Sequence, residues 1–307
     1  MDPEEILAQI RETERTMVRE LMKQVDIKSN GIRDASVAMY GRTDIMEGYW
    51  RLLSDCQYDI EEGLRLLKAA CDWHDAVRPK MKALIPKVYR DQPGLFSLRQ
   101  VGFDGDGKPL LYHCFAQDHA SPGDWTVDGI LTHVVHIVEN AGRSSRDKGG
   151  EERGMTMKLV IDCSGFVAAP FKSYENLTKL HQTLMLLYPN VIDTIAVVNY
   201  GREARIVWSG ICDILDDSLQ QKVKFCPEKE LDENLGPLSY DVLNWLQMEI
   251  HANSKATLGP VQRNFWLPTK GSSDHDPRGS KTFVTELIDR KSDSDGFENH
   301  PGIMYGS

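Results

Sequence analysis

The stretch from Met157 to Cys226 constrains the fold more than any other part of the chain. Apolar runs of strand type at 157–163, 193–199 and 221–226 alternate with runs of helical spacing at 174–188 and 204–219. Strands separated by helices at this interval form crossover units, and such units build a parallel sheet covered by helices. The sequence therefore predicts an α/β fold with a mainly parallel sheet.

The N-terminal part has a different pattern, with apolar residues at helical spacing and no run of strand type. Asp59 with Glu62 three residues later is typical of a helix start, and we expect Pro79 to end that helix. We therefore expect three parts: an N-terminal helical module over 1–92, an α/β domain over 93–253, and a C-terminal tail over 254–307. The tail is rich in Gly, Ser, Asp and Pro, and we expect it to be ordered in part at best.

A β-hairpin is predicted where the helical pattern ends. Residues 103–109 are dense in turn formers, and Leu110 to Phe115 follow as a short strand. Asp104 and Asp106 also suggest a calcium loop, but its fifth position would be Lys108 and its twelfth Phe115, neither of which is a calcium ligand. The segment is therefore interpreted as a hairpin turn.

Composition and charge exclude several classes of function. The net charge of −10 argues against a general nucleic-acid binder, because such proteins need excess Lys and Arg. No apolar run reaches the roughly 18 residues of a membrane-spanning helix, and the N-terminus lacks the apolar core of a signal peptide. The six cysteines contain no CxxC pair, so we expect reduced thiols. A cytoplasmic protein is the expectation.

Catalytic and metal-binding patterns are weak in this sequence. The best nucleophile is Cys163, which follows a strand and has His181 as its nearest candidate base. No G-x-S-x-G elbow, phosphate loop or dinucleotide fingerprint supports it. The histidines around His113 and His133 have no zinc-ligand spacing. We expect no enzyme, no metal and no cofactor, and an enzyme that uses Cys163 is the least favoured hypothesis.

Several short motifs occur in a particular order along the chain. They are Tyr49-Trp50-Arg51-Leu52-Leu53, Tyr58–Glu62, Trp73-His74, Gly102-Phe103-Asp104, Gly107-Lys108-Pro109, Val160-Ile161-Asp162 with Gly165, Tyr188-Pro189, Val198-Asn199, Trp208 and Lys222-Val223. In this order and spacing the chain resembles the CRAL-TRIO (Sec14-like) family of lipid-binding and lipid-transfer proteins, from about residue 40 to about residue 250. The resemblance implies a lipid, with a phospholipid as first choice, held in an internal pocket and transferred or presented between membranes.

Periodicity alone is typical of ordinary core strands, and the resemblance implies which of their residues would form such a pocket. In the first parallel strand, Leu159 and Ile161 share one face and Val160 lies on the other. The segment after Asn199 has an apolar helical face, which by itself is typical of an ordinary amphipathic crossover helix with solvated arginines. The resemblance implies that it is a gate, in a protein peripheral on membranes, with Arg202 and Arg205 placed to meet acidic head groups. Lys222 and Lys224 are expected at alternate positions of the last strand, where Lys222 either holds a lipid phosphate or is an edge charge. The predicted ligand-binding residues are Leu159, Ile161, Val197, Tyr200, Val207, Trp208, Ile211, Leu215 and Lys222.

Two positions depart from the family pattern. Asn190 stands where members that bind phosphatidylinositol commonly have a Glu, and Tyr200–Ala204 replaces the usual Asn-Ala-Pro-x-x-Phe segment before the gate helix. These departures leave a second hypothesis open, a protein-interaction module of the same fold with a collapsed pocket, such as a module that binds small GTPases.

Overall fold

The structure is a computed structural model, and it describes residues 3–28, 31–34, 36, 45–86, 97–117, 129–131, 133–135, 137–138, 141–142, 156–168, 174–215 and 217–255. Almost all of the predicted tail, 254–307, lies outside these residues. The chain divides into two compact units. Met1–Pro79 with Gln182–Val191 form a helical unit, and Lys80–His181 with Ile192–Ser307 form a sheet unit.

The helical unit contains α1 (Pro3–Lys28), α3 (Ile45–Asp55) and the first part of α4 (Ile60–Pro86). Leu21 of α1 and Leu53 of α3 are fully buried. The backbone N–H of Glu62 donates to the Asp59 carboxylate at 3.0 Å, which confirms the predicted cap of α4. The prediction that Pro79 ends this helix is wrong. A proline removes one helical hydrogen bond, and α4 continues to Pro86 without it.

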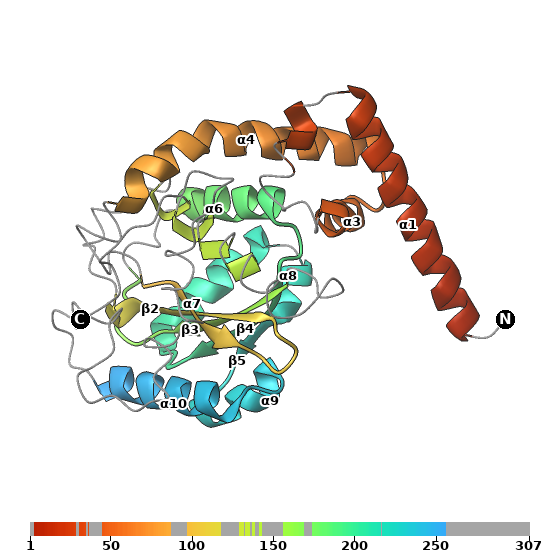
Figure 1. Cartoon of the computed structure of the whole chain (residues 1–307). Coiled ribbons are helices and arrows are strands. Elements are labelled where there is room, and N and C mark those ends of the chain that lie inside the picture. Colours follow the sequence, from red (N-terminus) through yellow and green to blue (C-terminus); the bar gives the residue numbers. More distant parts are fainter. Residues whose placement is uncertain are drawn as a thin grey trace, which may run out of the picture. The chain divides into compact units, whose positions relative to one another are not determined.

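The sheet unit is built on five strands in the order β1-β2-β3-β4-β5 (Figure 1). The strands are β1 (Arg99–Phe103), β2 (Pro109–Cys114), β3 (Met157–Asp162), β4 (Ile192–Val198) and β5 (Val223–Phe225). β1 and β2 are antiparallel, and the pairs β2–β3, β3–β4 and β4–β5 are parallel. This confirms the predicted α/β fold with a mainly parallel sheet.

The predicted hairpin joins β1 and β2. The Asp104 carboxylate accepts the backbone N–H groups of Asp106 and Lys108 at 2.9 and 2.8 Å, and Gly107 takes a positive φ of 81° that suits a residue without a Cβ. These bonds hold the segment as the predicted hairpin turn.

The β4–β5 connection differs from the single helix predicted over 204–219. It consists of α7 (Arg202–Ile211), the short η4 turn (Cys212–Ile214) and α8 (Asp217–Lys222). The break occurs because the Gln220 side-chain amide donates to the carbonyls of Cys212 and Leu215 at 2.8 and 2.9 Å, which satisfies groups that a continuing helix would have used. Lys222 is the last residue of α8, so the prediction that it shares a strand with Lys224 is wrong.

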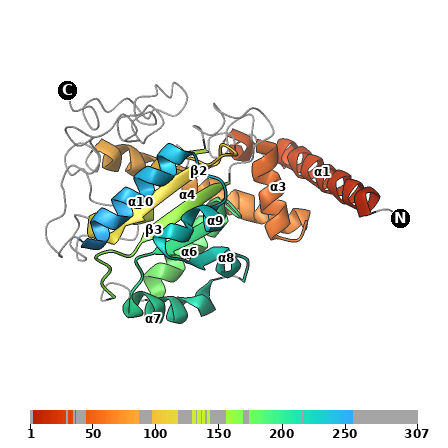
Figure 2. The ribbon, with the colours of Figure 1, turned by 90° about the horizontal axis from the view of Figure 1, so that it is seen from below.

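The remaining helices follow β3 and β5 in the sequence. α6 (Tyr174–Leu187) lies between β3 and β4 in the sequence, and η5 (Glu228–Glu230), α9 (Leu231–Leu235) and α10 (Tyr240–Lys255) follow β5. α10 crosses one face of the sheet (Figure 2). Of the helices in the described residues, none is both long and apolar enough to cross a membrane.

Candidate functional site

The strand register divides the central sheet into two faces of different character. Leu159 and Ile161 of β3 lie beside Ile195 and Val197 of β4, which in turn lie beside Val223 and Phe225 of β5. We call the side that carries these six residues the apolar face. The intervening residues point to the opposite side, which we call the closed face.

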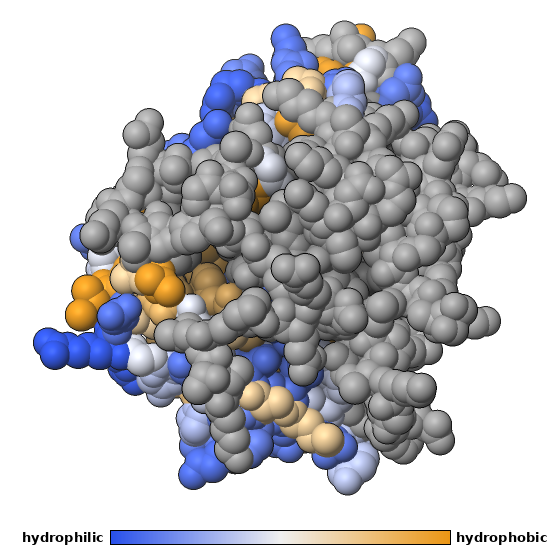
Figure 3. Space-filling model, turned by 90° about the vertical axis from the view of Figure 1, so that its left-hand side faces the viewer, coloured by the Kyte–Doolittle hydropathy of each residue, from blue (hydrophilic) through white to orange (hydrophobic). Residues whose placement is uncertain are grey.

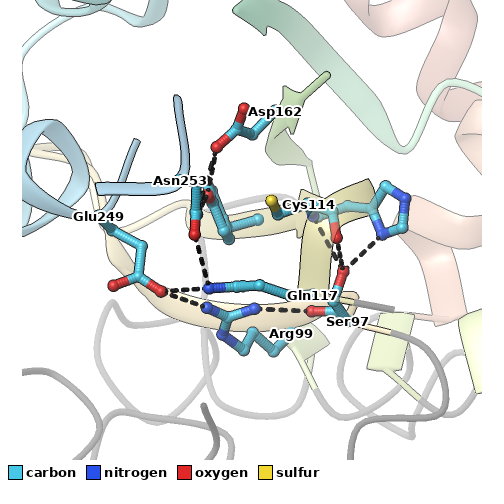
Figure 4. A network of polar contacts seen from close by, with 9 residues as sticks. Ser97, Arg99, Cys114, Gln117, Asp162, Glu249 and Asn253 are labelled. Atoms are coloured by element: carbon cyan, nitrogen blue, oxygen red, sulfur yellow. Dashed lines mark hydrogen bonds and ion pairs between the residues drawn. The ribbon is translucent and has the colours of Figure 1, made fainter. Parts of the chain in front are cut away.

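The closed face is fully packed under α9 and α10. Val160, Ala196 and Val198 are completely buried there. Arg99 of β1 is also completely buried, and its guanidinium pairs with Glu249 of α10 at 3.3 Å (Figure 4). A buried charge needs such a partner, since its desolvation is otherwise uncompensated. The contact therefore ties α10 to the sheet.

A second polar cluster on this face surrounds Asp162 at the end of β3. Its carboxylate accepts the Tyr112 hydroxyl and the Asn199 amide at 2.8 and 2.9 Å, and the backbone N–H of Ser164 at 2.9 Å. Asn253 of α10 donates to the Tyr112 oxygen at 2.8 Å and to the carboxylate at 3.3 Å (Figure 4). The ends of β2, β3 and β4 are thus joined to α10 by one connected network.

The other end of β3 is fastened in the same way. Lys158 is buried, and its ammonium group pairs with Asp104 of the hairpin at 2.7 Å and donates to the carbonyl of Leu235 in α9. All of these polar groups belong to the closed face or its edges, so buried polar contacts tie that face to the hairpin, α9 and α10.

The apolar face is incompletely buried except at Val197, which is 6% exposed. Leu159, Ile161, Ile195, Val223 and Phe225 are each of intermediate exposure, although all five are apolar. Figure 3 shows apolar side chains reaching the surface beside long hydrophilic ones on the side of the molecule that it presents. A half-buried apolar surface of this kind is typical of a binding site for an apolar ligand or a partner.

Helix α7 lies against this face with few contacts. Ala204 is its only buried residue, and it packs into a cluster with Val197 and Cys163. Trp208 contacts the edge of the Phe225 ring, with centroids 5.7 Å apart, and Val207 and Ile211 remain half-buried. A helix with so little buried surface contributes little to stability, and α7 can therefore serve as a movable cover of the apolar face.

The predicted site residues are placed unevenly. Ile161, Val197 and Tyr200 come together in the cluster around Ala204, and Tyr200 stacks edge-on against Phe225 at 5.1 Å. Leu215 lies after η4 and is half-buried, outside the residues of that cluster. Both arginines of α7 are exposed at its N-terminal end.

Sequence reasoning missed several residues of this cluster. Phe115, Phe166 and Phe225 all pack against it, and Phe115 and Phe166 contact each other edge to face at 5.0 Å. The sequence signal for Phe225 was available, because it is two residues from Val223 in a strand. Phe115 was predicted as the last residue of a strand but begins a 3-10 turn after β2, and Phe166 lies outside the strands, where no period applies.

The remaining candidates do not form a site for chemistry. Burial raises the pKa of Cys163 to about 12, with a further contribution from Asp162, so its thiol stays protonated and unreactive near neutral pH. Within the described residues, no three His, Cys, Asp or Glu side chains are arranged to hold a metal.

The helical unit has a concavity of its own, of about 430 Å³. It is lined by Met22, Val25, Asp26, Arg33, Asp34, Ile45 and Tyr49. Asp26 and Arg33 form an ion pair at 3.0 Å within this lining. Three charged residues among seven make it unsuitable for an acyl chain, so the apolar face is the better candidate site.

Comparison with known proteins identifies the class of this fold. Residues 94–238 match the family model of the CRAL/TRIO domain. A crystal structure of Sfh5 is similar in fold, with a TM-score of 0.53 and 13% identity over 77% of this chain and 98% of that chain. A search among curated proteins finds no match. Residues 94–238 thus match a domain family whose members are known for lipid binding and transfer.

Proposed function

We propose that the protein binds one hydrophobic lipid, of the phospholipid class, between the apolar face and α7 and carries or presents it at membranes. The supporting observation is the contrast within one sheet. Ile161, Ile195 and Val223 stay half-buried on the apolar face, whereas Val160, Ala196 and Val198 are fully buried on the other. An acyl chain gains about 0.8 kcal/mol for each CH₂ that it buries, so an apolar surface of this kind supplies the affinity.

The proposed route of entry is movement of α7. It joins the sheet through Gly201, and an added Cβ at that position would meet nothing within 4 Å, so the backbone there is not confined by neighbours. When α7 moves at a membrane, its apolar side, with Val207 and Ile211, exchanges the sheet for the bilayer. The protein would then act as a peripheral membrane protein without a metal or an organic cofactor.

Lipid extraction tests this function. Protein purified from cells is extracted and its lipids are identified by mass spectrometry, and transfer of phospholipids between vesicles is measured in parallel. Ile161→Asn is expected to lower both the lipid content and the transfer rate, because it places an amide on the apolar face. Ser218→Asn, at an exposed position of α8, is the matched control. Absence of any co-purified lipid together with absence of transfer contradicts the proposal.

A second function is favoured by one observation, the packing of Tyr200 and Trp208 on Phe225. These large rings cover part of the face near β5, as expected of a module whose lipid site is filled by its own side chains and which binds another protein instead. The same extraction separates the two functions. A lipid-free protein in which Trp208→Ala creates lipid binding would favour the interaction module.

A further inference from the structure

The two arginines of α7 differ from the other arginines that the structure describes. Six arginines each lie 2.5 to 3.8 Å from a carboxylate oxygen, namely Arg15, Arg19, Arg33, Arg51, Arg65 and Arg99. Within the described part of the chain, no carboxylate pairs with Arg202 or Arg205. Both side chains are exposed, so an anion from outside can reach them.

Arg205 has aromatic partners instead. Its guanidinium carbon lies 4.6 Å from the centre of the Tyr200 ring and 5.6 Å from that of Phe225. Cation–π contacts at an exposed site are weak, whereas a guanidinium binds a phosphate group with two parallel hydrogen bonds. A phosphate-rich surface therefore competes successfully with the two rings for this side chain.

The position of this contact matters because α7 is fixed at both ends and loosely held between them. Before the helix, the Asn199 amide donates to Asp162, to the Ser164 hydroxyl and to the carbonyl of Ile250 at 2.9, 3.0 and 3.2 Å. After it, Gln220 holds the carbonyls of Cys212 and Leu215. Between these anchors, Ala204 is the only buried residue of α7, and the contacts of Arg205 and Trp208 with aromatic rings add to what holds the helix on the sheet.

We propose that Arg205 is a latch that keeps α7 on the apolar face and is released by the phosphate groups of an anionic membrane. Arg202 and Arg205 bind these groups, and Ile206, which is 60% exposed, enters the boundary between head groups and acyl chains. The latch deepens the proposed function and rests on it for its purpose, because release of α7 uncovers the lipid site. Its physical basis is the competition between phosphate and two aromatic rings.

Two measurements on the full chain test the latch, and neither uses a bound lipid. The first is hydrogen–deuterium exchange of the peptide that covers α7, in solution without vesicles. Tyr200→Leu and Arg205→Gln are expected to raise its exchange about two- to fivefold, as one exposed cation–π contact allows, and Arg202→Gln is expected to leave it unchanged. Equal exchange in wild type, Tyr200→Leu and Arg205→Gln overturns the latch.

The second is binding to vesicles of phosphatidylcholine with or without phosphatidylglycerol. Arg202→Gln and Arg205→Gln should each weaken binding to the anionic vesicles about fivefold, the usual effect of one basic residue near such a surface. Tyr200→Leu should instead tighten it about two- to fivefold, because free energy no longer has to be spent on breaking the stack. Arg65→Gln, which removes an ion-paired arginine from the helical unit, is the matched control and should have no effect.

The direction of the Tyr200→Leu effect decides the proposal, since a residue that only supports the fold would not tighten membrane binding. Unchanged or weaker binding of this variant overturns it, and so does equal binding of the wild type to neutral vesicles. Inorganic phosphate alone should not speed the exchange of α7, and an equal response to it would make this a soluble-anion site. A protein that passes these tests but carries no lipid would contradict the proposed function and leave the latch intact.

Discussion

The two faces of the central sheet are formed by the same strands, but their side chains differ in burial and in hydrogen-bond partners. Lys158 and Asp162 lie on the closed face, and each is buried among several fixed hydrogen-bond or ion-pair partners. Leu159 and Ile161, their neighbours in β3, are half-buried, and Ile161 packs against the apolar cluster around Ala204. Buried polar groups require defined partners, and these partners fasten a face. A face without such polar partners is stabilised only by apolar packing. A bound ligand can replace that packing.

Breaking the Arg99–Glu249 pair should have the largest effect on this contrast. Glu249→Ala leaves the fully buried Arg99 without its carboxylate and should lower the free energy of unfolding by about 3–5 kcal/mol. Urea denaturation followed by circular dichroism measures it. Glu233→Ala, at an exposed position of α9, should change stability by less than about 0.5 kcal/mol. A small effect of Glu249→Ala would mean that α10 is not what closes this face.

The second prediction concerns the β2 edge of the apolar face, where His113 lies beside Ile161. Burial lowers the pKa of His113 from 6.5 to about 3, assisted by the charge of Arg99 and by His133. Burial also lowers the pKa of His133 to about 4, although its contact with the Leu98 carbonyl opposes this. This edge is therefore closed although it belongs to the apolar side.

Both histidines stay neutral in the folded protein, whereas the unfolded chain takes up protons as the pH falls through 6.5. Their contribution to stability is therefore complete above that pH and is lost below it. From about pH 7.5 to about pH 5.5 the free energy of unfolding should fall by about 3 kcal/mol, roughly 1.4 kcal/mol for each histidine. Urea titrations at several pH values measure the slope. The double variant His113→Gln/His133→Gln should flatten it, and an unchanged slope would place the protonation elsewhere.

Sequence periodicity predicts the layout of the sheet but not the difference between its faces. Alternation along β3 assigns Leu159 and Val160 to opposite sides, and the structure agrees. It does not reveal that Lys158 pairs with Asp104 across 54 residues of sequence, because a lysine in a strand is equally typical of an exposed edge. The break between α7 and α8 could not be predicted either, because the apolar positions continue through it. The Gln220 side chain bonds the carbonyls of Cys212 and Leu215 at this break. Long-range pairing and local capping decide these features, and neither has a sequence period.

Truncation of neighbouring side chains in β3 sharpens the comparison. Val160→Ala, on the closed face, should cost about 2–3 kcal/mol, because it leaves a cavity in a fully packed layer. Ile161→Ala removes more carbon but from a half-buried position and should cost only about 1–2 kcal/mol. For lipid content the order should reverse, with Ile161→Ala losing more bound lipid. Denaturation curves measure the stability of each variant, and lipid extraction from the same preparations measures its bound lipid. If the two variants ranked in the same order for both losses, the two faces would not differ in role.

The smallest effect on overall stability, and the most specific to α7, is expected at Gly201. Its φ of −90° suits any residue, and an added Cβ has open space around it. Gly201→Ala should therefore change the free energy of unfolding by less than about 0.5 kcal/mol, because the loss of backbone entropy in the unfolded chain offsets the poorer N-cap. Gly165→Ala is the contrasting variant. There φ is +72° and the new Cβ would lie 2.7 Å from the Ala116 backbone, so a clear loss of stability is expected. If α7 moves about Gly201, the alanine variant will slow lipid exchange between vesicles while its denaturation curve matches the wild type. Normal lipid exchange by Gly201→Ala would show that α7 does not move about this residue. The difference between the two faces would then depend on packing alone.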